Sequence, residues 1–107
     1  MAAMNLNHEQ FDHYQNEGKL MLVDYWAPWC GYCRRIGPAY ELIADQFDAE
    51  VEIVKINIDE EAELANAEAI EVIPTLVMYK GGKAVNSIVA PESKAMIESF
   101  IWESMDK

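Results

Sequence analysis

Hydrophobic and polar positions repeat along the chain with two different periods, which predict strands and helices in turn. Residues 20–26 are a near-continuous apolar run without glycine or proline, and such a run is typical of a central strand covered on both faces. Residues 51–58 are rich in β-branched side chains and partly alternating, so they predict a second strand. A helix over residues 30–48 is predicted by apolar residues at helical spacing: Ile36, Tyr40, Ile43 and Phe47.

Local signals place three further helices. Asn7, followed three residues later by Gln10, has the pattern of a capping box at a helix N-terminus. Gly18 is a typical residue at which this helix would end. A short acidic, alanine-rich helix is predicted over residues 60–69. Apolar residues at helical spacing after Ser93 predict an amphipathic helix at the end of the chain.

A β-hairpin is predicted near the end of the chain, where Gly81 and Gly82 separate two apolar runs, residues 75–79 and 84–89. The predicted order is therefore helix, strand, helix, strand, helix, strand, strand, helix. Alternation followed by a hairpin indicates an α/β protein, in which helices cover both faces of a central mixed sheet. The pattern leaves open whether the first six residues add a strand.

Length and composition fit one globular domain over residues 1–107, since a second core needs roughly another hundred residues. Nineteen acidic and eight basic residues give a net charge of -11, so neither nucleic acid nor a membrane surface is expected as a partner. The first seven residues lack the basic and apolar regions of a secretory signal, and no apolar run approaches the ~20 residues of a membrane helix. We expect a cytoplasmic monomer.

The chain has two cysteines, Cys30 and Cys33, which lie where the strand of residues 20–26 leads into the following helix. Cys30 is expected at the helix N-terminus and Cys33 one turn later on the same side, so the two sulfur atoms can meet. Free N–H groups and the positive end of the helix dipole would stabilise a thiolate at Cys30, which makes it the nucleophile. Cys33 lies deeper and would attack a mixed disulfide formed by Cys30, which is thiol–disulfide exchange. This chemistry needs no metal and no bound cofactor.

Three other uses of the cysteine pair stay open. Half a zinc site would need two more ligands, but the two histidines, His8 and His13, lie together in the first predicted helix. A purely structural disulfide would close so short a loop that it would add little stability. The third alternative is a pair of inert buried thiols. A Cys-x-x-Cys pair beside a strand–helix–strand unit in a cytosolic chain favours redox chemistry over all three.

Residues 26–34, WAPWCGYCR, resemble the active-site segment of the thioredoxin family. Four further segments match the family in order and spacing, so the resemblance runs nearly end to end: VDYW at 23–26, KINID at 55–59, IPTL at 73–76 and GG at 81–82. The resemblance implies the thioredoxin fold, a central mixed β-sheet flanked by four helices on both faces. It also implies a protein-disulfide reductase that acts on disulfide-containing proteins and is recharged by a thioredoxin reductase, either NADPH- or ferredoxin-linked.

The resemblance implies catalytic roles for three residues besides the cysteines. Asp24 matches the family's buried aspartate, which is proposed to take the proton of the resolving cysteine, and burial in an apolar strand would raise its pKa. Lys55 resembles the lysine near that aspartate, and Pro74 matches the family's cis-proline, which faces the disulfide. The plainer alternatives are a solvated aspartate at a strand end, a lysine snorkelling from a strand edge, and a trans turn.

An apolar collar around Cys30 would suit an extended or unfolded peptide, which would pair with the backbone of Ile73 by β-augmentation. The collar would consist of Trp26, Pro28, Trp29, Tyr32, Ile73 and Pro74. Trp26 taken by itself is better explained as part of the core. The substrate-binding residues that the resemblance implies are Trp29, Gly31, Tyr32, Ile73 and Ala90.

The sequence departs from the family pattern at two places beside the cysteines. Tyr32 replaces the usual proline, and its N–H near Cys30 should stabilise the thiolate and make this protein a weaker reductant. Ala90 and Pro91 stand where the family usually has Gly-Ala, and the Cβ of Ala90 would narrow the docking surface. Two alternative functions stay open: an oxidant or isomerase of raised potential, which Tyr32 favours, and a non-enzymatic docking subunit that uses the collar to hold partners.

Overall fold

A five-stranded sheet with strand order β1-β3-β2-β4-β5 forms the middle of the protein. The computed structural model describes residues 3–107. The strands are β1 (Met4–Asn5), β2 (Met21–Trp26), β3 (Glu52–Asn57), β4 (Thr75–Lys80) and β5 (Lys83–Val89). The helices are α1 (His8–Asn16), α2 (Gly31–Gln46), α3 (Ala62–Ala67) and α4 (Lys94–Met105). β1, β3 and β2 run parallel, whereas β4 and β5 are antiparallel to their neighbours, so the sheet is mixed as predicted.

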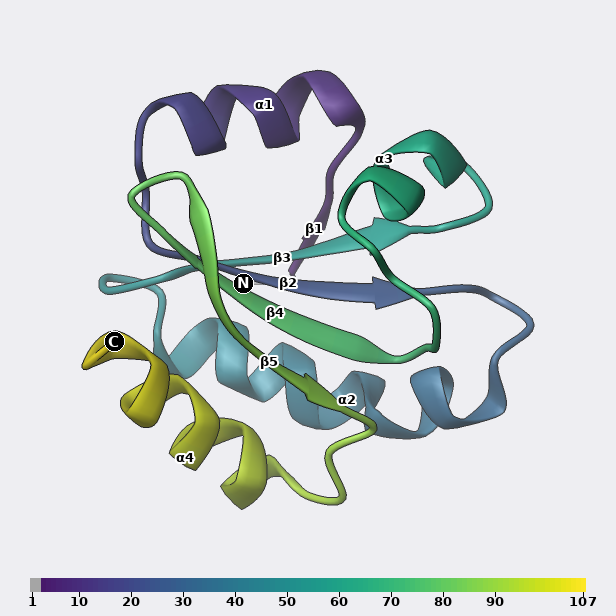
Figure 1. The fold of residues 1–107 in the computed structure, drawn as a ribbon. Helices are drawn as coiled ribbons and strands as arrows, with labels where there is room; N and C mark the ends of the chain where they lie inside the picture. The colour runs from purple at the N-terminus through teal and green to yellow at the C-terminus, as the bar shows by residue number, and fades with distance from the viewer. Residues whose placement is uncertain (1–2) are drawn as a thin grey trace.

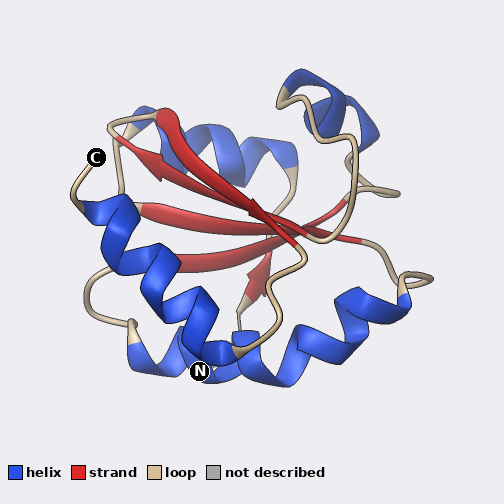
Figure 2. Cartoon of the chain, turned by 60° about the horizontal axis from the view of Figure 1, so that its bottom comes forward, coloured by secondary structure: helices blue, strands red, loops and turns tan. Residues whose placement is uncertain are grey.

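Helices cover both faces of this sheet, α1 and α3 on one side and α2 and α4 on the other (Figure 1, Figure 2). β2 contributes to the hydrophobic core on each side because its side chains alternate between the two faces. Leu22 packs on the α2 side, and Met21 and Val23 pack on the α1 side. All three are fully buried, which stabilises the fold by about 1.5–3 kcal/mol for each side chain. The predicted α/β class, with helices on both faces of a central mixed sheet, is confirmed.

The predicted limits of α1 are confirmed, and they rest on local chemistry. The Asn7 side chain accepts a hydrogen bond from the Gln10 N–H, and the Gln10 side chain accepts one from the Asn7 N–H, which is the predicted capping box. Gly18 follows the helix with a φ of +69°, a conformation that glycine adopts without a steric penalty. The sequence pattern left open whether the first six residues add a strand, and the structure has the short strand β1 there.

α3 is shorter than the helix predicted over residues 60–69. The N–H groups of Glu60 and Glu61 both donate to the Asn57 carbonyl at the end of β3, so these residues form a turn before the helix begins. At the other end, Ala69 has a φ of +58°, in the left-handed region that a right-handed helix cannot include. Backbone geometry at both ends therefore limits the helix to Ala62–Ala67.

A chain of hydrogen bonds ties the end of α3 to the sheet. The Tyr79 hydroxyl on β4 donates to Glu68 Oε1 at 2.6 Å and lies 2.7 Å from the Tyr25 hydroxyl on β2. Because Tyr79 uses its proton on Glu68, Tyr25 is the donor to Tyr79. Burial raises the pKa of both tyrosines, so both hydroxyl groups stay protonated at neutral pH.

Replacing Tyr79 with phenylalanine should lower the free energy of unfolding by about 1–3 kcal/mol, because the buried Tyr25 hydroxyl would lose its acceptor. The measurement is the urea midpoint of Tyr79→Phe against the parent protein. Tyr14→Phe is the matched control, since Tyr14 lies on α1 and is only partly buried. A loss in Tyr79→Phe no larger than that in Tyr14→Phe would contradict this chain of hydrogen bonds.

Candidate functional site

The two cysteines lie together at the start of α2, just beyond the end of β2 (Figure 1). Cys30 is the N-cap of α2, and Cys33 lies in its first turn. Their Cα atoms are 5.3 Å apart and their sulfur atoms form a disulfide, so the predicted meeting of the two side chains is confirmed. The helix begins at Gly31, one residue later than predicted, because Cys30 has an extended backbone conformation. It ends at Gln46, two residues before the predicted limit.

The N-terminus of α2 directs positive polarity at Cys30. The Cys33 backbone N–H donates to Cys30 Sγ at 3.2 Å. The first turn of the helix has no acidic residue, and Arg34 and Arg35 follow the pair. Cys30 is 9% exposed and Cys33 is 4% exposed, so the residue whose sulfur accepts the hydrogen bond is also the more accessible one. In the dithiol form this arrangement stabilises a thiolate at Cys30.

Four partly buried apolar side chains pack against the cluster that Ala27 forms with the two cysteines: Trp26, Tyr32, Ile58 and Ile73. Sequence reasoning missed Ile58, although its place at the end of the strand predicted over residues 51–58 was an available signal. Trp26, which was expected in the core, is only partly buried, and its indole N–H donates to the Asn5 side chain at 2.8 Å. The surroundings of the disulfide are thus apolar, with a partly different set of residues from the expected collar.

Two residues of the expected collar are exposed to solvent. Pro28 and Trp29 lie in the turn before Cys30, and the Trp29 side chain is 65% exposed. The Trp29 indole N–H donates to Asp59 Oδ2 at 2.9 Å, which fixes the ring toward the segment that follows β3. Trp29, which directly precedes Cys30 in the sequence, therefore presents an apolar ring at the surface.

The loop before β4 brings Ile73 against the cluster of Ala27 and the two cysteines. The Ile73–Pro74 peptide bond is cis, as the family resemblance implies, and Pro74 is buried. No hydrogen bond within residues 3–107 uses the backbone N–H or C=O of Ile73, so both groups are free to pair with an extended peptide. The Pro74 carbonyl accepts a hydrogen bond from the Ala90 N–H at 2.9 Å, which brings a second loop beside the first.

Asp24 is buried in β2, on the side of the sheet that α2 covers, and is 2% exposed. Its Oδ1 atom has no hydrogen-bond partner. Burial raises the pKa of Asp24 from the usual 3.8 to about 7, while the charge of Lys55 opposes this rise and that of Glu41 adds to it. The alternative of a solvated aspartate at a strand end is therefore wrong.

Lys55 is the neighbour of Asp24 on β3, in register with it across the two strands. Its ammonium group lies 4.9 Å from the centre of the Trp26 ring, which is a cation–π contact. The lysine is half-buried. Its charge is thereby held near the carboxyl group whose pKa it lowers.

Gly31, Tyr32 and Ala90, the other residues expected to bind substrate, lie around the start of α2. Gly31 is exposed, with open space where a Cβ would project. Ala90 has a φ of +47°. The Tyr32 hydroxyl donates to the Pro91 carbonyl at 2.9 Å, so its hydrogen bond is made within the protein.

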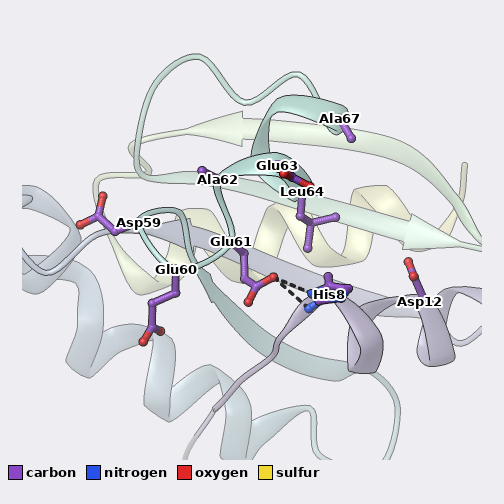
Figure 3. A pocket seen from close by; sticks show the side chains of 9 residues that line it. All are labelled: His8, Asp12, Asp59, Glu60, Glu61, Ala62, Glu63, Leu64 and Ala67. Atoms are coloured by element: carbon purple, nitrogen blue, oxygen red, sulfur yellow. Dashed lines mark hydrogen bonds and ion pairs between the residues drawn. The ribbon is translucent and has the colours of Figure 1, made fainter.

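A hollow of about 610 Å³ lies between α1 and the segment around α3 (Figure 3). Its carboxylates come from both segments: Asp12, Asp59, Glu60, Glu61 and Glu63. The His8 backbone N–H donates to Glu61 Oε1 at 3.1 Å, and the His8 ring lies against the same oxygen. None of the predicted site residues lines this hollow, and Asp59 is the carboxylate that connects it to the site, through the hydrogen bond from Trp29.

Residues 3–107 contain neither a candidate metal site nor a candidate membrane span. No three His, Cys, Asp or Glu side chains lie in an arrangement that could hold a metal ion. No helix in the same range is both long enough and apolar enough to cross a membrane.

Comparisons with known proteins find similar sequences and a similar structure. A family model described as Thioredoxin matches residues 2–103. Thioredoxin 1 of Nostoc sp. is 42% identical over 81 residues, which is 76% of each chain. The thioredoxin of Alicyclobacillus acidocaldarius is 36% identical over 98 residues, 92% of this chain and 93% of its own. A solved structure of Plasmodium falciparum thioredoxin matches with a TM-score of 0.85 at 28% identity, covering 95% of this chain and 98% of that one.

Proposed function

This chain belongs to the thioredoxin family and is a thiol–disulfide oxidoreductase that reduces protein disulfides, and we propose that its Cys30 attacks the substrate disulfide and its Cys33 resolves the mixed disulfide. The hydrogen bond from the Cys33 N–H to Cys30 Sγ carries this proposal, because it stabilises negative charge on the sulfur of the more exposed cysteine. The Cys30 thiolate bonds to one sulfur of the substrate disulfide, and the other substrate sulfur leaves as a thiolate and takes up a proton. The Cys33 thiolate then attacks Cys30 Sγ, which forms the disulfide of this protein and releases the second substrate thiol. Two electrons pass in this way to the substrate.

Asp24 is the proton acceptor that converts Cys33 to its thiolate in this proposal. A carboxyl group with a pKa of about 7 exchanges protons near neutral pH, whereas an ordinary aspartate is too weak a base for a thiol. The unpartnered Oδ1 atom supports this role, since it is free to take a proton. Lys55, in register with Asp24, limits the rise of that pKa.

Substrates dock as extended segments beside the disulfide. The free N–H and C=O groups of Ile73 pair with the substrate backbone, next to the buried ring of Pro74. Trp29, Gly31 and Ala90 form the rim of this docking surface. The exposed Trp29 indole supports the proposal, because an unfolded substrate segment can cover its apolar area.

A thioredoxin reductase, NADPH- or ferredoxin-linked, returns the oxidised protein to its dithiol form. Both cysteines of the chain are used in the disulfide, so the electrons that reopen it come from another molecule. We also propose that residues 1–107 act as one domain, as a monomer and in the cytoplasm. This part of the proposal rests on the family and on the sequence patterns described above.

Reduction of insulin disulfides tests the proposed function. With dithiothreitol as donor, the protein should cleave insulin disulfides faster than dithiothreitol does alone. Repeating the assay with an NADPH-linked or a ferredoxin-linked reductase as the sole source of electrons would identify the donor. If the protein gives no acceleration with dithiothreitol, the proposal of a reductase fails.

Tyr32 favours one second candidate, an oxidant or isomerase of raised potential. Tyrosine at this position has a backbone N–H in the first turn of α2, where a proline has none. That N–H adds to the positive polarity around the Cys30 thiolate and so stabilises the reduced form. A protein whose reduced form is stabilised is a weaker reductant.

Replacing Tyr32 with proline should therefore lower the reduction potential, by about 30 mV for each tenfold change in the equilibrium with glutathione. The measurement is the fraction of oxidised protein in glutathione buffers of known ratio, with free thiols trapped by alkylation. The parent serves as the reference. A parent potential equal to or below that of Tyr32→Pro would remove the support for this candidate.

A further inference from the structure

Tyr32 links the start of α2 to the loop between β5 and α4. Its hydroxyl donates to the Pro91 carbonyl at 2.9 Å, and the Ala90 carbonyl lies at 3.3 Å. The Tyr32 ring packs against the cluster of Ala27 and the two cysteines and against the core on the α2 side of the sheet. The Arg35 guanidinium lies 5.8 Å from the centre of this ring. The side chain is therefore fixed at both ends, by packing at the ring and by a hydrogen bond at the hydroxyl.

The loop that receives this hydrogen bond has an unfavourable backbone conformation. Ala90 has a φ of +47°, in the left-handed region, where a Cβ crowds the following carbonyl. Its N–H donates to the Pro74 carbonyl at 2.9 Å, so the loop is also tied to the segment that carries Ile73. A residue keeps such a conformation only where the surrounding contacts impose it. Tyr32 on one side and Pro74 on the other supply those contacts.

We propose that Tyr32 is a positioning residue for protein substrates: its hydroxyl holds Ala90 and Pro91 in place next to the first turn of α2, which carries the disulfide. This inference rests on the proposed function, because it takes a substrate segment to lie between Ile73 and this loop. A loop that is already ordered loses less conformational entropy when a protein segment binds against it. A small disulfide compound contacts only the sulfur atoms and not this loop, so the ordering of the loop does not increase its affinity. Tyr32 thereby favours protein disulfides over small ones.

Two parts of Tyr32 have separate effects, and phenylalanine separates them. The backbone N–H acts on the Cys30 thiolate and is present in both residues, whereas only tyrosine has the hydroxyl that reaches Pro91. Tyr32→Phe also keeps the ring that packs against the cluster of Ala27 and the two cysteines. The substitution removes the link to the loop, and we expect the redox potential to stay at the parent value.

The experiment mixes the pre-reduced protein with insulin at increasing concentrations, then alkylates the remaining thiols and counts them by mass spectrometry. In Tyr32→Phe, the half-saturating insulin concentration should rise about three- to tenfold, the effect of one hydrogen bond. The limiting rate, and the rate with cystine as a small disulfide, should change by less than about twofold. Amide hydrogen exchange at Ala90 should accelerate, because its bond to Pro74 opens more often. Tyr14→Phe, on α1, is the matched control.

An unchanged half-saturating insulin concentration in Tyr32→Phe would overturn the inference. An equal loss with cystine, or a shifted redox potential, would overturn it as well, since the hydroxyl would then act at the sulfur atoms. Failure of the parent to reduce insulin would refute the proposed function and with it the role toward substrates. Exchange at Ala90 is independent of insulin, so unaltered exchange in Tyr32→Phe would show separately that the hydroxyl does not hold the loop.

Discussion

Replacing Cys30 with serine should abolish the reduction of insulin disulfides, with a fall in rate of at least about a thousandfold. A serine hydroxyl is not ionised near neutral pH and cannot form a disulfide, so the first exchange step is lost. Cys33 is the one other cysteine of the chain, and it is the less exposed of the two. The measurement is insulin reduction with dithiothreitol as donor, corrected for the rate of dithiothreitol alone.

Cys33→Ser is the matched variant, because it removes the resolving thiol and keeps the attacking one. It should stop after the first exchange and accumulate mixed disulfides with proteins of a cell extract, whereas Cys30→Ser should accumulate none. Trapping by Cys30→Ser, or equal trapping by both variants, would contradict the assignment of Cys30 as the attacking sulfur. If Cys30→Ser kept partner binding and biological activity, the docking subunit would become the better description.

Much of the fold could be predicted from the sequence because its signals are local or periodic. A central strand covered on both faces is apolar at most successive positions, and the run at residues 20–26, which contains β2, has that pattern. The capping box of Asn7 and Gln10 acts within one turn of helix, so residue type and spacing are sufficient to identify it. The cysteines could be placed for the same reason, since a strand followed by a helix fixes Cys30 at the helix N-terminus.

The hydrogen bonds of side chains around the site could not be predicted, because their partners are distant in the sequence. Trp29 lies 30 positions from Asp59, and Tyr32 lies 59 positions from Pro91. Residue type indicates that an indole or a phenol needs a partner, but the partner depends on which loops the folded chain brings together. The hydrogen bond of Trp29 to Asp59 and the loop contact of Tyr32 therefore became evident only in the structure.

Replacing Asp24 with asparagine should raise the free energy of unfolding relative to the parent by an amount that depends on pH. This gain should be several kcal/mol larger at neutral and higher pH than at acidic pH. The folded-state pKa of about 7 lies above the usual 3.8, so between these pH values the folded protein holds a proton that the unfolded chain has released. Stability therefore falls as the pH rises through this window, and the loss is complete above the folded-state pKa. A shift of roughly three pKa units corresponds to about 4 kcal/mol.

Urea unfolding of the oxidised parent and of Asp24→Asn, from about pH 4 to about pH 8, measures this difference. Comparing the pH dependence of the two proteins removes the constant cost of burying an amide in place of a carboxyl group. Asp12→Asn, which changes an exposed carboxylate on α1, is the control and should keep the parent's pH dependence. Parallel curves for the parent and Asp24→Asn would show that burial does not raise the pKa of Asp24.

Asp24→Asn should gain stability, and it should also carry out the second exchange step, the attack of Cys33 on the mixed disulfide, more slowly than the parent. An amide cannot take the proton of Cys33, so mixed disulfides at Cys30 should persist longer than in the parent, by about a hundredfold for the loss of a general base. Quenching the reaction at intervals and counting the mixed disulfides measures this rate, with Cys33→Ser as the limit in which no resolution occurs. A buried carboxyl group that destabilises the fold and also speeds catalysis is a stability–activity trade-off. If Asp24→Asn resolves mixed disulfides as fast as the parent, the proton leaves Cys33 by another route and the trade-off does not exist.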